Sequence, residues 1–274
     1  MRRRPFGLDR AGQRARLTSC RPGVEVMESR QLLATFTVMN TADSGAGSFR
    51  QAILDANSTL NTGSTPDTID FAITTGVGDV KTIQPATPLP VISESVLIDA
   101  NTQPGAGTTS TPRVELDGSL IATAGVNGLS IASPGVTVRG LVVNQFSGAG
   151  IEISNGASGA SITNTFIGTD ASGVSAAPNG VGIQINGAPN NTIGGAGAGL
   201  RNLISGNLGD GVSIIGAAST GNLVQGNLIG TDITGSAPLG NANGVVIAGD
   251  GAASSGARNN TIGGLGVGAG NTIS

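Results

Sequence analysis

The 274-residue chain contains no His, Trp or Tyr and only one Cys. These absences exclude zinc fingers, Ser-His-Asp triads, imidazole general bases and thiolate metal clusters. With only six Phe, the chain also lacks the aromatic platforms on which bases and sugars commonly stack. No run approaches the 18 or so apolar residues of a membrane span. Gly is abundant, at 46 residues, but it shows no Gly-X-Y period, which excludes collagen and favours glycine at the turns of a repeat protein.

Charge is distributed unevenly along the chain. Residues 1–34 hold eight Arg and three acids, a net charge of +5, whereas residues 35–274 hold six bases and fourteen acids, a net charge of −8. The basic segment has no apolar stretch of the 7 to 15 residues that a conventional signal peptide needs. The acidic remainder argues against nucleic acid as a partner. Residues 1–34 are therefore expected to form a segment separate from the body of the protein.

The body of the chain is a repeat. Five segments begin with Gly, an apolar residue, any residue and Ile, and they start at intervals of 22, 32, 29 and 33 residues. They start at Gly128, Gly150, Gly182, Gly211 and Gly244. Each interval contains two further short β-branched runs bounded by Gly or Asn, which are typical of strands. Three strands per turn predict an all-β protein, a parallel β-solenoid, with regular repeats over residues 128–274.

Insertions interrupt alternate turns of this repeat. The sequence IGTD recurs after 62 residues and NNTIGG after 69. Glycine-rich loops at 196–201 and 265–270 are expected between the second and third strands of their turns. Loops at 171–179 and 233–243 are expected after the third strand. Two edges of the β-helix should therefore carry loops on every second turn.

Residues 35–127 are expected to hold a short capping helix and the irregular first turns of the β-helix. Ser48 and Gln51 fit a capping box, and Asn57 can close the end of the helix. Its predicted apolar face consists of Phe49, Ala52, Ile53 and Ala56. Because an open solenoid end exposes its core, this helix is expected to act as a cap. The apolar runs at 82–83, 96–98 and 114–116 are predicted strands.

Two parts of the sequence resemble known families. Residues 40–53, NTADSGAGSFRQAI, are similar to the segment that opens the CSLREA class of bacterial right-handed parallel β-helix proteins, whose fold is pectin lyase-like. Phe49 and Gln51 replace the commoner Leu and Glu, and the residue directly before Ser48 is Gly47 rather than Cys. The NNTIGG, NLISGN and GNLIGTD units resemble the repeats of the same proteins, so this resemblance covers about residues 35–274. It implies a large surface or secreted β-helix protein without an assigned reaction.

The basic N-terminal segment carries the second resemblance. Residues 27–33, MESRQLL, are similar to the LEPR-XLL element of large planctomycete surface or secreted proteins, with departures at Met27 and Ser29. This resemblance implies that residues 1–34 are export-associated and that the protein is extracellular or on the cell surface. A basic arm without an assigned role is the alternative. The last residues, NTIS at 271–274, match NLIS at 202–205 without a polar cap, so we expect the sequence to be a fragment of a longer multidomain chain.

The sequence suggests one candidate site. Counting along the third strands places Asp170, Asn207 and Asp232 in one column, with the two carboxylates about 10 Å apart across two turns. That separation is near the upper end used by inverting glycosidases, so Asp170 and Asp232 are the catalytic candidates if the chain is an enzyme. The simpler interpretation is that the three side chains form a binding ladder or satisfy backbone groups as Asx turns. It is favoured because no His is present.

The functional expectation follows from these features. We expect an exported cell-surface or extracellular scaffold with a structural or adhesive role, whose partner is a surface glycan or a protein. The alternative is a carbohydrate-active enzyme, a polysaccharide lyase or glycoside hydrolase of pectin lyase-like fold. No cofactor and no metal site is expected. Calcium takes six to eight oxygen ligands, so the three side chains of the column would bind it only weakly.

Overall fold

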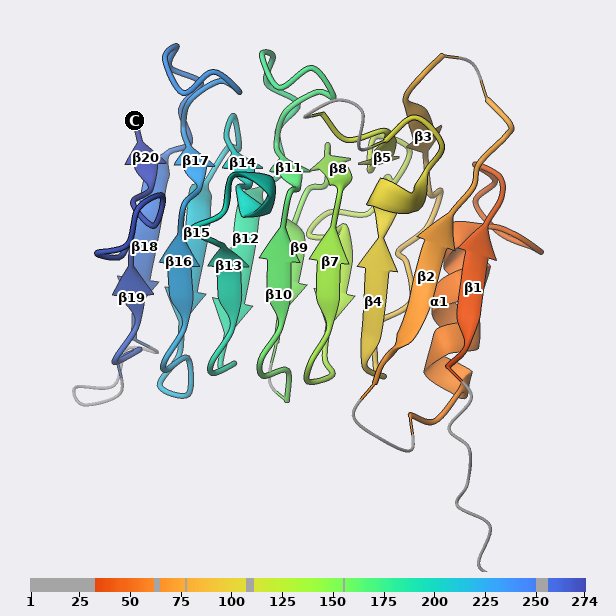
Figure 1. Cartoon of the computed structure of the whole chain (residues 1–274), viewed down its shortest axis with the longest axis horizontal. Helices are drawn as coiled ribbons and strands as arrows, with labels where there is room; N and C mark the ends of the chain where they lie inside the picture. Colours follow the sequence, from red (N-terminus) through yellow and green to blue (C-terminus); the bar gives the residue numbers. More distant parts are fainter. Residues whose placement is uncertain (1–32, 62–64, 77, 107–110, 155, 250–255) are drawn as a thin grey trace, which may run out of the picture. The chain divides into compact units, whose positions relative to one another are not determined.

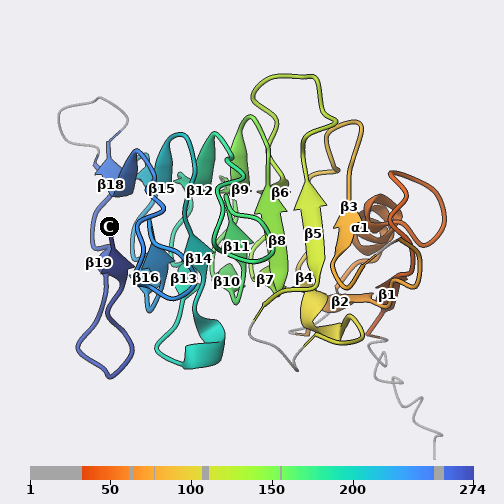
Figure 2. The ribbon, with the colours of Figure 1, turned by 90° about the horizontal axis from the view of Figure 1, so that it is seen from above.

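The computed structural model describes residues 33–61, 65–76, 78–106, 111–154, 156–249 and 256–274. Predictions for the basic N-terminal segment therefore lie outside the described residues, except for its last two residues. The described chain forms three parallel β-sheets whose strands stack in chain order, as Figures 1 and 2 show. This arrangement is a parallel β-helix with three strands per turn and confirms the predicted fold class.

From β6 onward each turn gives one strand to each sheet, whereas the earlier turns give strands only to sheets A and B. Sheet A contains β1 (Thr35–Val38), β2 (Asp67–Phe71), β4 (Val96–Asp99), β7 (Thr137–Arg139), β10 (Ser161–Thr163), β13 (Thr192–Gly194), β16 (Leu223–Gln225) and β19 (Thr261–Ile262). Sheet B contains β3 (Lys81–Ile83), β5 (Val114–Asp117), β8 (Leu141–Asn144), β11 (Phe166–Ile167), β14 (Leu203–Ile204), β17 (Leu228–Ile229) and β20 (Thr272–Ile273). Sheet C contains β6 (Leu129–Ile131), β9 (Ala149–Ile153), β12 (Val181–Asn186), β15 (Asp210–Ile215) and β18 (Asn243–Ala248).

The core consists of aliphatic ladders that run along the inner faces of the sheets. Alternation along each strand sends one set of side chains inward, and the parallel register places equivalent side chains over one another. In sheet A the ladder is Ile69, Ile98, Val138, Ile162, Ile193 and Val224, all fully buried. In sheet B it is Leu116, Val143, Ile167, Ile204 and Ile229. The β-branched runs in the sequence are therefore the inner layer of the coil.

The first Gly of each repeat marks the place where sheets B and C converge. A Cβ added at Gly182 would lie 2.8 Å from Cγ2 of Ile204, and one at Gly150 would lie 2.9 Å from Cγ2 of Ile167. Real Cβ atoms do not approach other carbons so closely, so no larger residue fits there without displacement. This requirement explains why the repeat begins with glycine.

Helix α1 (Phe49–Ser58) covers the first turn of the β-helix beside β1 and β2 (Figure 1). Its buried residues are the four predicted ones, Phe49, Ala52, Ile53 and Ala56, and the Ser48 hydroxyl caps the helix by accepting from the Gln51 N–H at 3.2 Å. The prediction for Asn57 was wrong: its side chain bonds to Val91 and Ser93, and Thr59 is the C-cap. The two strands that the sequence analysis missed are β1 and β2, and they form the edge beneath this helix.

Asparagine ladders join successive turns at all three corners. In each ladder, the backbone N–H and the side-chain Nδ2 of one Asn donate to Oδ1 of the Asn one turn further on. The ladders are Asn191–Asn222–Asn260, Asn202–Asn227–Asn271 and Asn179–Asn207–Asn241. Except in Asn191 and Asn222, the Nδ2 groups also donate to backbone carbonyls of the preceding turn, for example from Asn202 to Ile162 at 2.8 Å. The side chains thus satisfy backbone groups that the corners leave without strand partners.

A second apolar cluster lies on the outer face of sheet B. Val142, Phe166, Leu203 and Leu228 form an outward-facing ladder that is nonetheless buried. Ala171 and Ile233, from the loops that follow β11 and β17, pack over it. These two loops also meet directly, because the Ile233 N–H donates to the Gly173 carbonyl at 2.9 Å. The loops are therefore anchored to the sheet and to each other.

Candidate functional site

The column predicted from Asp170, Asn207 and Asp232 is not formed. Asn207 is 4% exposed and belongs to the interior ladder, where it accepts from Asn179 at 3.1 Å and donates to Asn241 at 2.9 Å. The inserted loops run between each Asp and the corner, so the residues that stack on Asn207 lie at the far ends of those loops. Asn207 therefore serves the interior of the coil and does not accompany the two acids.

Asp170 and Asp232 instead organise the loops that follow β11 and β17. The Asp170 carboxylate accepts from the Ser172 hydroxyl at 2.7 Å and, over longer distances, from the backbone N–H groups of Val174 and Ser175. Each carboxylate thus closes a turn of its own loop, as the Asx-turn interpretation predicts. Among the described residues, no contact joins Asp170 to Asp232.

The environment of Asp232 stabilises its charged form. Its carboxylate accepts from the Thr234 hydroxyl at 2.7 Å and from the N–H groups of Ser236 and Ala237 at 3.2 Å. The bond from Thr234 is the main reason why the pKa of Asp232 lies below its usual value, and the two backbone donors act in the same direction. A general acid needs a raised pKa, so this carboxylate is unsuited to protonate a leaving group.

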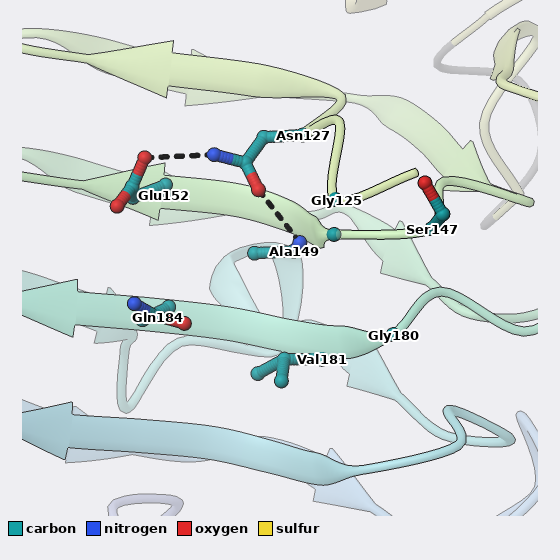
Figure 3. Close-up of a pocket in the computed structure, with 9 residues that line it drawn as sticks. Gly125, Asn127, Ser147, Ala149, Glu152, Gly180, Val181 and Gln184 are labelled. Carbon is teal, nitrogen blue, oxygen red and sulfur yellow. Dashed lines mark hydrogen bonds between the residues drawn. The ribbon is translucent and has the colours of Figure 1, made fainter. Parts of the chain in front are cut away.

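A polar groove crosses the outer face of sheet C (Figure 3). It has a volume of about 480 Å³, within the usual range of ligand sites. Its lining residues are Gly125, Asn127, Ser147, Gly148, Ala149, Glu152, Gly180, Val181 and Gln184. They come from β9, β12 and the segments that precede β6, β9 and β12. The groove therefore crosses neighbouring turns of the coil rather than following one strand.

Glu152 and Asn127 are the ordered polar pair of this groove. Nδ2 of Asn127 donates to Glu152 Oε2 at 2.7 Å, while Oδ1 of the same side chain accepts from the Ala149 N–H at 2.8 Å (Figure 3). Asn127 thereby fixes one carboxylate oxygen and leaves the other without a hydrogen bond from any described residue. Gln184 lies beside Glu152 in the register of the sheet, and its side-chain amide has no partner in the described chain. The free groups of the groove are one carboxylate oxygen and one carboxamide.

This arrangement can bind a ligand, but it lacks the parts of an acid–base site. Among the nine lining residues Glu152 is the only titratable side chain, and no Lys or Arg is present. Acid–base hydrolysis of a glycosidic bond uses two carboxyl groups, and a lyase needs a proton acceptor beside charge-neutralising groups. The chemistry supported by the groove is hydrogen bonding and charge attraction.

The sequence analysis missed the groove, although a signal was present. The third position of the five Gly-initiated repeats points outward from sheet C, and the register places these residues in one row: Ser130, Glu152, Gln184, Ser213 and Val246. The row is polar in its first four turns. Comparing the outward positions of the repeats, rather than the ends of the third strands, would have identified it.

A charged cluster lies on the outer face of sheet A. Arg139 donates to Asp99 at 2.6 Å, and Asp70 lies beside Asp99 in the register. Burial, followed by the charge of Asp99, raises the pKa of Asp70 above its usual value, whereas the bond with Asp99 raises the pKa of Arg139. Since the cluster pairs its charges internally, it resembles a structural contact more than a binding site.

Within the described ranges, no three His, Cys, Asp or Glu side chains lie together in an arrangement that could hold a metal ion. No helix of the described chain is both long and apolar enough to cross a membrane. No protein-family model matches the chain, and a search of curated proteins found no significant match.

Proposed function

We propose that this protein is a β-helix scaffold of the cell surface or extracellular space, with a structural or adhesive role, and that it contacts its partner through the groove on sheet C. The groove carries the proposal because it offers a fixed carboxylate and one free carboxamide without a second titratable residue. Such a surface favours binding over chemistry. The partner is a surface glycan or a protein.

The rest of the coil supports a structural role. Successive turns are joined by the asparagine ladders at the three corners. Inside the coil they are also joined by the buried aliphatic ladders. A scaffold of this kind holds its outward side chains at fixed spacings of about 4.8 Å along the axis. A groove built on it is preorganised, which lowers the entropy cost of binding.

Binding to immobilised polysaccharides and to cell-surface extracts tests this function. We expect Glu152→Gln to weaken binding by about tenfold, since a hydrogen bond to a charged group contributes roughly 1.5–3 kcal/mol. Asp170→Asn, which changes a partly buried acid outside the groove, is the matched control and should bind as the wild type does. Equal binding by the wild type and Glu152→Gln would show that the partner is not bound through the groove.

Export is tested separately. We expect residues 1–34 to direct a fused reporter out of a bacterial cell of the appropriate type, because the segment is basic and resembles an export-associated element. Retention of the reporter inside the cell would contradict the proposed location without affecting the groove.

The rival function is a carbohydrate-active enzyme that uses Asp170 and Asp232. One observation favours it: the loops that carry these acids contact each other through Ile233 and Gly173. Incubation with acidic and neutral polysaccharides, followed by assays for new reducing ends and unsaturated products, separates the two functions. Product release that is lost in Asp232→Asn, with the circular dichroism spectrum unchanged, would establish the enzyme and overturn the scaffold.

A further inference from the structure

The side chains of the groove on sheet C offer a ligand two free acceptor atoms and one free donor atom. A carboxylate only accepts hydrogen bonds, and one oxygen of Glu152 has no donor among the described residues. The carboxamide of Gln184, on the neighbouring strand, adds an acceptor oxygen and a donor NH2 group (Figure 3). The side chains of Asn127 and Ser147 are already bonded to other residues of the coil. A ligand that satisfies the groove therefore presents both donors and an acceptor.

The outer face of sheet C is negatively charged around this groove. The five strands of the sheet contain two acids, Glu152 and Asp210, and no Lys or Arg. The nine residues that line the groove include no cation either. Charges interact over about 8 Å at physiological ionic strength, so an anionic group beside Glu152 would meet a like charge without compensation. The face therefore disfavours acidic ligands.

A cationic ligand satisfies only part of the groove. An ammonium group donates hydrogen bonds but accepts none, so the NH2 group of Gln184 would remain without an acceptor. A guanidinium group pairs best with both oxygens of a carboxylate, and Asn127 already occupies one oxygen of Glu152. A hydroxyl group donates and accepts, so two neighbouring hydroxyls satisfy Glu152 and Gln184 together. The free groups thus match an uncharged ligand that is rich in hydroxyls.

We propose that the groove binds an uncharged glycan and discriminates against acidic glycans. Because this names the class of partner that the groove contacts, it rests on the function proposed above. One sugar hydroxyl donates to the free oxygen of Glu152, and a neighbouring hydroxyl exchanges hydrogen bonds with the carboxamide of Gln184. These two side chains lie on adjacent turns, about 4.8 Å apart, and the polar row continues with Ser130 and Ser213 on either side. The glycan therefore crosses the strands and follows the axis of the coil.

The test compares neutral glycans with charged derivatives of the same polymers. The whole chain is titrated with soluble β-glucan, xylan and galactomannan, and with the carboxymethylated form of each. We expect at least one neutral glycan to bind and its carboxymethylated form to bind at least about tenfold more weakly, because its carboxylates approach Glu152. Raising the salt concentration from about 0.05 M to about 0.5 M should change the affinity for the neutral form by less than about twofold, because no ion pair forms.

Glu152→Gln separates discrimination from affinity. This variant removes the charge and retains a side chain of the same shape, so the preference for the neutral form should fall from at least about tenfold to about threefold or less. Asp170→Asn removes a carboxylate outside the groove and is the matched control. It should keep both the affinity and the preference of the wild type.

Two results would overturn the uncharged glycan as the ligand. The first is a carboxymethylated glycan that binds as tightly as its neutral parent, or more tightly. The second is the absence of binding to all three neutral glycans. In either case, a partner from cell-surface extracts that binds the wild type but not Glu152→Gln would leave the groove as the contact surface, so the proposed function would stand. Equal binding of every partner by the wild type and Glu152→Gln would instead refute the proposed function.

Discussion

Removing the side chain of Asn207 should destabilise the corner between sheets B and C. In Asn207→Ala, the backbone N–H of Asn179 loses its acceptor, and the Nδ2 of Asn179 keeps only the Val143 carbonyl. The carbonyl of Ile167 and Oδ1 of Asn241 each lose one of two donors and keep a backbone N–H, from Ser205 and from residue 207. Asn207 and Asn179 are 4% and 0% exposed, so bulk water does not replace these bonds freely. Four lost hydrogen bonds at about 1 kcal/mol each indicate a loss of about 3–5 kcal/mol in the free energy of unfolding.

Thermal unfolding followed by far-ultraviolet circular dichroism measures this effect, and the absence of Trp and Tyr makes intrinsic fluorescence a poor alternative. The expected loss corresponds to a decrease in Tm of roughly 6–20 °C for a domain of this size. Because long repeat arrays can unfold in parts, hydrogen exchange at the Phe146 and Asn179 amides should be measured alongside, and both should exchange faster.

Asn243→Ala is the control for Asn207→Ala. Asn243 is also an asparagine near the start of a sheet C strand, but it is exposed and bonds to Asp210 at the surface. Its removal should change the free energy of unfolding by less than about 0.5 kcal/mol. If Asn207→Ala melts within the error of the Asn243 variant, the ladder does not stabilise the corner and our reasoning about its buried donors is wrong.

Three further predictions follow from local contacts. Gly182→Ala should lower the free energy of unfolding by about 1–3 kcal/mol in urea titrations because its Cβ would press on Ile204, whereas Gly240→Ala, with open space around it, should be neutral. Burial raises the pKa of Asp70, so its contribution to stability is fully present below its unfolded value of 3.8 and is lost as pH rises through the folded value. Asp70→Asn should therefore raise Tm at pH 7 and leave it unchanged at pH 3; a lower Tm at pH 7 would contradict this sign. Thr234→Val should move the pKa of Asp232 upward in a carboxyl NMR titration without changing Tm, and an unmoved pKa would show that the hydroxyl is not the main cause.

The strands were predictable because the same residues specify both local conformation and burial. β-Branched runs favour extended backbone, and in a coil of stacked parallel strands their inward members must also be apolar. The apolar face of helix α1 was predictable for a similar reason. The strands β1 and β2 were missed because they lie outside the Gly-initiated repeat, although the pattern Asp67–Phe71 alternates buried and half-buried positions.

The candidate site was less predictable because inserted loops change the number of residues between a strand and the next corner. Counting residues from the strand therefore does not give a residue's position in the coil. Asp170 and Asp232 directly follow their strands, whereas the residues that return to the corner are Asn179 and Asn241, after the insertions. Counting backward from the next Gly-initiated repeat places Asn179, Asn207 and Asn241 three or four residues before it and would have given the correct stack. The groove depends on which outward side chains lie beside one another, and that information comes only from the register.

The asparagine ladders also make the coil electrically directional. Every bond between two ladder side chains runs from the Nδ2 of one Asn to the Oδ1 of the Asn one turn further on, so these bonds have the same direction at all three corners. Hydrogen-bonded amides polarise one another, which strengthens each chain in the direction of donation. The partial positive ends of the three chains lie at Asn241, Asn260 and Asn271, and the partial negative ends lie toward the N-terminal turns. The three asparagine ladders therefore give the described coil one common direction of hydrogen-bond donation, from the N-terminal turns toward Asn241, Asn260 and Asn271.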